Sequence, residues 1–208
     1  MKILFFGDSI TDAGRSRDRR GNARYGYGYV MQIVGRLFES EPMKHEIINS
    51  GIAGDRTVDM YARIKADVWN FKPDVLSILA GVNDACLDVI HHNGVELDRF
   101  ERIYRMIIED TVKALPDTKI IICEPFLGRG SETDARYDEL REEVSKYAKA
   151  IRRIANDLSI PFVPLWEKIS EATERHGEGS MLYDGVHPSV EGATLIANEW
   201  LKAYRSLI

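Results

Sequence analysis

Short apolar segments alternate with longer segments of helical periodicity along the whole chain. Runs rich in β-branched and aliphatic residues predict strands at 2–6, 46–49, 75–79, 119–123 and 161–163. Apolar residues recur every three or four positions between and after these runs, which predicts helices at 29–38, 58–69, 100–115, 137–158 and 193–204. Such alternation is typical of an α/β fold in which helices cover both faces of a parallel sheet.

Polar and glycine-rich segments follow the predicted strands. Ser9 follows the first strand, and the segments "NSGIAGDRT", "AGVNDAC" and "EPFLGRG" follow or complete the next three. Another such segment, "HGEGSMLYDGVHPS", precedes the last helix. Parallel sheets place their working residues beyond the carboxyl ends of the strands, so we expect any catalytic set at this edge.

A serine hydroxyl needs a neighbouring base before it becomes a good nucleophile. Among the five histidines, His187 stands in "YDGVHPS", three residues after Asp184 and directly before Pro188, and Ser189 can cap the last helix. An aspartate and a histidine at this spacing in a turn can hydrogen-bond, and a carboxylate of this kind holds a catalytic imidazole in its tautomer. The alternative is a plain Asp-Gly turn with His187 at the surface, and Ser9 can equally be a cap or a surface hydroxyl.

Acyl transfer also needs hydrogen-bond donors for the oxyanion of the tetrahedral intermediate. Gly54 can bring its backbone N–H close to a ligand, and Asn83 offers an amide just after the third predicted strand. Taken singly, Gly54 is equally a turn glycine, and Asn83 with Asp84 is equally a helix N-cap. Their placement after neighbouring strands favours an oxyanion site beside Ser9.

Four segments in this order resemble the four sequence blocks of the SGNH (GDSL) hydrolases. They are "GDSIT" at 7–11, "NSGIAGD" at 49–55, "GVND" at 81–84 and "DGVHP" at 184–188, and together they span almost the whole chain. The motif differs from the G-x-S-x-G elbow of α/β-hydrolases, because Thr11 stands two residues after Ser9.

The resemblance implies a flavodoxin-like three-layer sandwich, with about five parallel strands in the order 2-1-3-4-5, over one domain at 1–208. It implies Ser9 as nucleophile, His187 as base and Asp184 as the acid that orients it. Oxyanion donors would come from Ser9, Gly54 and Asn83. The resemblance also implies that no metal or organic cofactor is needed and that the protein forms a homo-oligomer.

The first two blocks also suggest a substrate. "GDSITDAGR" followed by "YGYGYV" at 25–30 is similar to the bacterial carbohydrate acetylesterases, including acetylxylan esterases. We expect an acetylated oligosaccharide as substrate, with Asp8 and Tyr183 as substrate-binding residues. Tyr183 is favoured among the aromatic residues because it adjoins Asp184. The aromatic residues that could stack on sugar rings are Tyr25, Tyr27, Trp166 and Tyr183.

The first loop is rich in arginine, with Arg15, Arg17, Arg19, Arg20 and Arg24 within "GRSRDRRGNAR". One interpretation is a solvated loop or a subunit contact. The other is that part of the loop borders the site and meets an anionic sugar or a partner subunit.

Composition and charge exclude several classes of protein. The 208 residues carry a net charge of −5, so there is no overall basic surface for nucleic acid. No stretch approaches the roughly 18 apolar residues of a membrane helix. The apolar run "MKILFF" ends at Gly7, too early for a signal peptide, so we expect a cytoplasmic protein that does not bind membranes.

Three other functions stay open. A lysophospholipase or short-chain acyl thioesterase would use the same blocks and would prefer longer acyl chains. A metallophosphoesterase would also place Asp, Asn and His after strands, but it needs several ligating histidines and only His187 is well placed. A non-catalytic sugar-binding module would have no need of Ser9, Asp184 and His187 together.

Overall fold

The computed structural model describes residues 1–18 and 20–208, so Arg19 of the arginine-rich loop lies outside the described residues. Its five strands form one parallel sheet in the order β2-β1-β3-β4-β5. The strands are β1 (Lys2–Gly7), β2 (Glu46–Gly51), β3 (Val75–Leu79), β4 (Lys119–Cys123) and β5 (Phe162–Val163). The α/β class, the strand order and the positions of all five predicted strands are confirmed.

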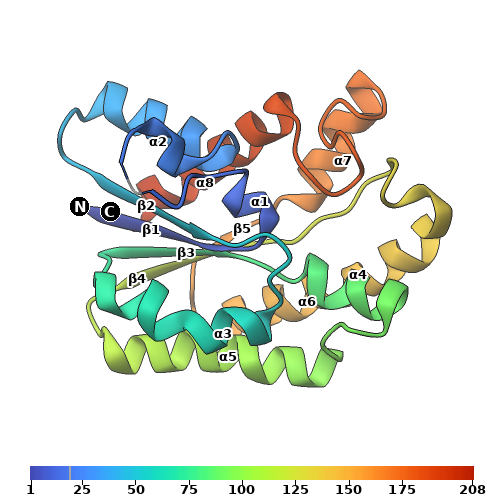
Figure 1. Cartoon of the computed structure of the whole chain (residues 1–208), viewed down its shortest axis with the longest axis horizontal. Coiled ribbons are helices and arrows are strands. Elements are labelled where there is room, and N and C mark those ends of the chain that lie inside the picture. Colours follow the sequence, from blue (N-terminus) through green and yellow to red (C-terminus); the bar gives the residue numbers. More distant parts are fainter. Residues whose placement is uncertain (19) are drawn as a thin grey trace.

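Helices cover both faces of this sheet, which gives three layers (Figure 1). On one face lie α2 (Tyr29–Ser40), α7 (Trp166–His176) and α8 (Val190–Leu207). On the other lie α3 (Thr57–Asp67), α4 (Val82–His91), α5 (Leu97–Ala114) and α6 (Tyr137–Asp157). Shorter helical segments are α1 (Ser9–Asp12), η1 (Asn22–Tyr25), η2 (Trp69–Phe71) and η3 (Asp134–Arg136).

The central strands are buried on both faces, as their continuous apolar sequence requires. Residues 3–6 of β1 have no exposed surface, and every residue of β3 is buried. Trp200 of α8 packs against Phe5, with ring centroids 5.0 Å apart, and its indole N–H donates to the Ser77 hydroxyl at 2.9 Å. The indole N–H of Trp200 is therefore paired although it is buried, and it joins α8 to the central strand β3.

Besides the four-residue α1, two longer helices, α4 and α7, are absent from the sequence-based expectation. In α7 only Ile169 and Ala172 are buried, which is too narrow a stripe to reveal a helix by periodicity. The helix α4 begins inside the "GVND" segment, at Val82. The residue before it, Gly81, has a φ of 119° and is the N-cap. Asn83 and Asp84 therefore lie in the first turn of α4 and are not its N-cap.

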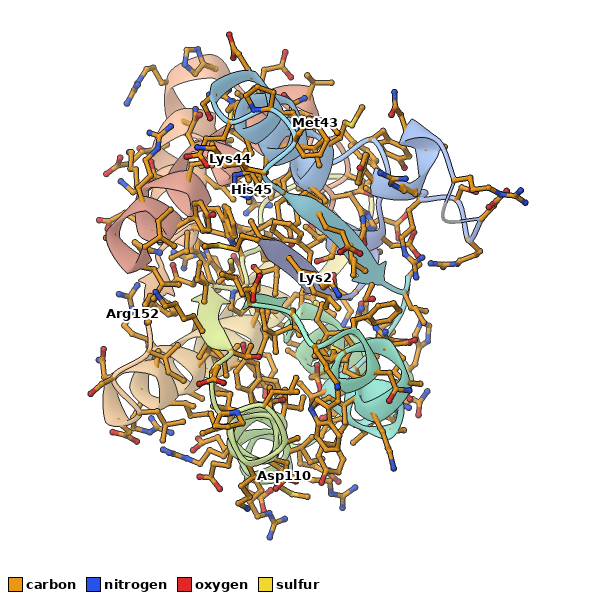
Figure 2. All side chains as sticks on the ribbon, turned by 90° about the vertical axis from the view of Figure 1, so that its left-hand side faces the viewer. Lys2, Met43, Lys44, His45, Asp110 and Arg152 are labelled. Carbon is orange, nitrogen blue, oxygen red and sulfur yellow. The ribbon has the colours of Figure 1, made fainter. Side chains whose placement is uncertain are left out.

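The strand order creates a crevice beside the end of β1. The chain continues from β1 toward α2 on one face and from β3 toward α4 on the other (Figure 1). Parallel sheets bind ligands where the connections of neighbouring strands run to opposite faces in this way. Figure 2 views the opposite, amino-terminal edge, where Lys2 and the loop at 43–45 lie, so this crevice is at the far end of the strands.

Candidate active site

Ser9 lies at the point where β1 turns sharply into α1. The Asp8 side chain caps the helix, because its Oδ1 accepts a hydrogen bond from the Ile10 N–H at 3.0 Å. Ser9 is the first residue of α1, and its side chain is partly exposed at the carboxyl edge of the sheet. The turn thus presents the hydroxyl to the crevice between β1 and β3.

Asp184 and His187 lie on a narrow loop before α8. Leu182 and Pro188 form an antiparallel bridge across this loop, and the Tyr183 N–H donates to the His187 carbonyl at 3.0 Å. The loop ends at Ser189, whose hydroxyl accepts from the N–H of residue 192 at 3.0 Å and caps α8. The expected cap at Ser189 is confirmed, and it fixes where the loop meets the helix.

The loop after β4 holds the Asp184 loop from the other side. The Gly128 N–H donates to the Gly185 carbonyl at 2.8 Å, and the Glu132 N–H donates to the Asp184 carbonyl at 3.0 Å. The two loops therefore run in close contact, which gives the glycine-rich segment "EPFLGRG" a structural role that was not predicted from the sequence. A β-carbon on Gly130 would lie 2.2 Å from the Asp184 carbonyl carbon, so only glycine allows this close approach.

Hydrogen bonds join the three side chains in one line. Ser9 Oγ lies 2.9 Å from His187 Nε2, and His187 Nδ1 lies 2.6 Å from Asp184 Oδ2. The second oxygen of Asp184 accepts from the N–H groups of Val186 and His187 at 2.9 and 2.7 Å. This arrangement can pass the proton of Ser9 to the imidazole while the carboxylate holds the ring in place.

The Asp184 carboxyl is stabilised in its charged form. Burial raises its pKa, but the hydrogen bonds from the His187 and Val186 N–H groups and from the His187 ring outweigh burial, so the pKa is lowered. Asp184 therefore carries its charge at neutral pH, as a partner for an imidazolium must.

Two hydrogen bonds link the segments that carry the residues predicted to hold an oxyanion. The Asn83 side chain donates to the Asp55 carbonyl at 3.0 Å, which ties α4 to the turn that contains Gly54. The Ile52 N–H donates to the Gly7 carbonyl at 3.0 Å, which ties the same turn to the end of β1. Within the described residues, the N–H groups of Ser9 and Gly54 form no backbone hydrogen bond.

Arg63 of α3 links the strand ends beside the predicted oxyanion site. It was not among the residues predicted from the sequence. Its guanidinium donates to the carbonyls of Gly7 and Ser50, at 3.2 and 2.9 Å. It also pairs with the carboxylates of Asp55, at 2.6 Å, and Asp67, at 2.9 Å. One side chain therefore holds the ends of β1 and β2 and the residue that follows Gly54.

Asp8 was expected to touch substrate, and its environment does not fit that role. Its side chain is fully buried, and its Oδ2 has no hydrogen-bond partner within the described residues. Its pKa is raised to about 7, chiefly by burial and also by the charges of Asp84 and Asp55, which together outweigh the lowering effect of the Ile10 hydrogen bond. Asp8 is therefore a buried cap of α1, and its burial argues against the predicted contact with substrate.

Asp84 forms a second buried carboxyl group close to the site. Its Oδ1 accepts from the N–H and the hydroxyl of Thr57, at 2.9 and 2.6 Å, while its Oδ2 has no partner in the described part of the chain. Burial raises its pKa to about 6, although the Thr57 hydrogen bonds act in the opposite direction. Asp84 thus anchors the start of α3 to α4, next to Asn83.

The four aromatic candidates occupy different environments. Tyr183 is 56% exposed and stacks on the His187 ring, with centroids 5.8 Å apart and planes 19° apart. Tyr27 is 70% exposed near Ser9, whereas Tyr25 is buried and cannot stack on a ligand. The fourth residue, Trp166, lines a separate cavity together with residues of α6.

The described arginines of the first loop make internal contacts. Arg15 and Arg17 both donate to the Gly51 carbonyl, at 2.9 and 3.0 Å, and Arg17 also pairs with Asp12 at 2.6 Å. Arg24 lies over the ring of the tyrosine that follows it. Two of these arginines therefore hold the chain segment just before Gly54, a structural role that neither interpretation of the loop included.

Two kinds of feature are absent from the described residues. No helix there is long and apolar enough to cross a membrane. No group of three or more His, Cys, Asp or Glu side chains in that part of the chain is arranged to hold a metal ion.

Comparisons with known proteins identify the family to which the chain belongs. The model of the GDSL-like Lipase/Acylhydrolase family matches residues 5–195. An acetylxylan esterase of Geobacillus stearothermophilus is 32% identical over 97% of this chain and 92% of its own length. The isoamyl acetate-hydrolyzing esterase of Saccharomyces cerevisiae is 26% identical over 97% of this chain and 84% of its own length.

A solved structure extends the likeness to three dimensions. The crystal structure of Axe2, an acetylxylan esterase from Geobacillus stearothermophilus, superposes with a TM-score of 0.85 at 32% identity, covering 97% of this chain and 93% of that chain. Catalytic mutants of Axe2 replace a serine, an aspartate and a histidine with alanine. From the family match, the relatives and the fold together, the chain belongs to the GDSL-like lipase/acylhydrolase family and is a carboxylic ester hydrolase.

Proposed function

We propose that the protein is a serine esterase that removes O-acetyl groups from carbohydrates through an acyl-enzyme intermediate. One hydrolase domain over 1–208 would carry the activity. The observation that supports the mechanism most directly is the hydrogen-bonded line from Ser9 through His187 to Asp184. It lies where the connections after β1 and β3 run to opposite faces of the sheet, which is the place where such sheets bind ligands.

In the first step, Ser9 Oγ attacks the ester carbonyl carbon while His187 Nε2 takes the hydroxyl proton. The resulting imidazolium is stabilised by the Asp184 carboxylate, which stays ionised. The tetrahedral intermediate then collapses, the bond to the alcohol oxygen breaks, and His187 returns its proton to that oxygen. The alcohol leaves, and the acetyl group stays bound to Ser9.

In the second step, water attacks the acetyl-serine ester. His187 takes a proton from the water, and the second tetrahedral intermediate collapses to release acetate. The proton held by His187 returns to Ser9 Oγ, which restores the starting state. The oxyanion of each intermediate would accept hydrogen bonds from the N–H groups of Ser9 and Gly54 and from the Asn83 amide.

Of the two parts of the proposed ester substrate, the acetyl group is better supported than the alcohol. One relative is an acetylxylan esterase and another is an isoamyl acetate-hydrolyzing esterase, so their substrates share the acetyl group and differ in the alcohol. The carbohydrate alcohol rests on the more similar of these two relatives and on the exposed Tyr183 beside His187.

A long acyl chain fits the site less well. The pocket that contains Ser9 and His187 has a volume of only about 20 Å³, and it is bordered by Tyr27, Tyr183 and Pro188 and by the small or apolar residues Ile10, Ala13 and Gly28. A cavity of about 480 Å³, lined by residues such as Val112, Ile120 and Leu158, lies at the start of β4. Because the strands are parallel, this cavity is at the edge of the sheet opposite Ser9.

The test is acetate release from acetylated xylo-oligosaccharides, run beside p-nitrophenyl esters from acetyl to octanoyl. We expect acetate release that Ser9→Ala abolishes, and kcat/KM that falls steeply beyond short acyl chains. Ser9-dependent cleavage of octanoyl esters without acetate release from the sugars would instead favour the lysophospholipase or thioesterase alternative. Full activity in Ser9→Ala would refute the mechanism.

A further inference from the structure

Two large aromatic side chains are exposed at the mouth of the proposed active site. Tyr27 and Tyr183 both line the small pocket that contains Ser9 and His187. They are 70% and 56% exposed, respectively. Exposed apolar surface gathered at one place marks an interaction site, whereas singly scattered apolar residues do not.

Tyr183 is held in place by the catalytic loop itself. Its ring stacks on His187, and its backbone N–H donates to the His187 carbonyl at 3.0 Å. Burial, and then the charge of Asp184, raises the pKa of the Tyr183 hydroxyl, which therefore stays protonated at neutral pH and can donate to a ligand. The ring thus combines a fixed position with an open surface.

Tyr27 is fixed by a tight turn against the helix that carries Ser9. Its backbone N–H donates to the Ala13 carbonyl at 3.0 Å. Its ring lies against Gly14, where a β-carbon would be 2.6 Å from the tyrosine Cε1. The segment "YGYGY" therefore places an exposed ring on a constrained backbone, which reduces the entropy lost when a ligand binds.

The two rings lie on the side of the site where the alcohol must leave. The carbonyl oxygen faces the donors at Ser9, Gly54 and Asn83, and His187 must reach the alcohol oxygen to protonate it. Tyr183 contacts His187 directly, and Tyr27 borders the same cavity. A group bound between the rings is therefore the alcohol and not the acyl chain.

We propose that Tyr27 and Tyr183 form a subsite that binds the pyranose ring of the departing sugar alcohol. A pyranose presents C–H groups on its faces and hydroxyls at its rim, which suits two aromatic rings that also carry hydroxyl groups. A small alkyl alcohol lacks such a face and gains less from the pair. This inference rests on the proposed function and adds the residues that select its alcohol.

The experiment compares Tyr27→Ala and Tyr27→Phe with the wild type on two acetate esters. A methyl acetyl-xyloside supplies the pyranose, ethyl acetate supplies an alcohol without a ring, and acetate release is measured for both. We expect Tyr27→Ala to raise KM for the xyloside about tenfold, with a loss of kcat/KM several times larger than on ethyl acetate. Tyr27→Phe should restore most of the activity, because it keeps the ring.

Matched controls separate this inference from the proposed function. Met43→Ala removes a side chain that is 99% exposed at the opposite edge and should leave both substrates unaffected (Figure 2). Equal losses on both esters in Tyr27→Ala, or a Phe variant as poor as the Ala variant, would overturn the subsite. A wild type that cleaves ethyl acetate but not the xyloside would instead refute the carbohydrate substrate, and the subsite with it.

Discussion

The buried Asp8 carboxyl predicts a stability that depends on pH. Its pKa is raised from 3.8 to about 7, chiefly by burial, because Oδ2 has no hydrogen-bond partner in the described residues. Between these two pH values the folded state holds a proton that the unfolded state has lost. The free energy of unfolding therefore falls as pH rises from about 4 to about 7. Because one proton is involved, it falls by about 1.36 kcal/mol per pH unit.

The change Asp8→Asn removes this ionisation and keeps a side-chain oxygen that can cap α1. One pKa unit corresponds to about 1.36 kcal/mol, so the effect of Asp8 between pH 5 and pH 8 is roughly 3 kcal/mol. We subtract the free energy of unfolding of the wild type from that of Asp8→Asn at each pH. We expect this difference to rise by roughly 3 kcal/mol from pH 5 to pH 8, because only the wild type loses stability through Asp8.

The assay is urea unfolding of both proteins at pH 5 and pH 8, with Asp117→Asn as a control at an exposed loop position. Asp84 and Asp55, the acidic neighbours of Asp8, are present in both proteins, so their direct contributions cancel in the comparison. A difference between the Asp8→Asn and wild-type proteins that stays constant from pH 5 to pH 8 would refute the reasoning.

Two further predictions concern the oxyanion site and its support. Asn83→Ala should lower kcat about a hundredfold or more, because loss of one oxyanion donor costs about 2.7–4 kcal/mol, and steady-state kinetics on p-nitrophenyl acetate would measure it. Arg63→Ala should lower the free energy of unfolding by about 3 kcal/mol, since Asp55 is left buried and unpaired, and Arg63→Lys should recover part of the loss. By comparison, Arg102→Ala removes an exposed ion pair and should cost less than about 1 kcal/mol, and an equal cost at both positions in urea unfolding would contradict the role given to Arg63.

Local pattern was sufficient to predict the five strands, whereas their order in the sheet came from the family resemblance. The strands are short apolar runs bounded by polar segments, and the sequence positions of all five agree with the structure to within two residues. The helices with broad apolar stripes, such as α6, were predicted for the same reason. The helix α7 was not, because it buries too few residues to produce a clear period.

Some residues of the candidate site could be predicted from short motifs, whereas others depend on contacts between distant parts of the chain. Ser9, Asp184 and His187 stand in distinctive short motifs, so the sequence pointed to them before any distance was known. The contacts of Arg63 with the ends of β1 and β2 are not visible in sequence, because they join an ordinary helix position to strand ends far along the chain. Burial of Asp8 likewise depends on packing that no local pattern specifies.

The central claim is that Ser9 is the residue that carries the acyl group. The most direct measurement is rapid mixing of the protein with p-nitrophenyl acetate, an acid quench, and mass spectrometry of the proteolytic peptides. We predict an added acetyl group on the peptide that contains Ser9, and none on that peptide in Ser9→Ala. An acetyl group on a different residue, formed and lost at the rate of turnover, would contradict the account.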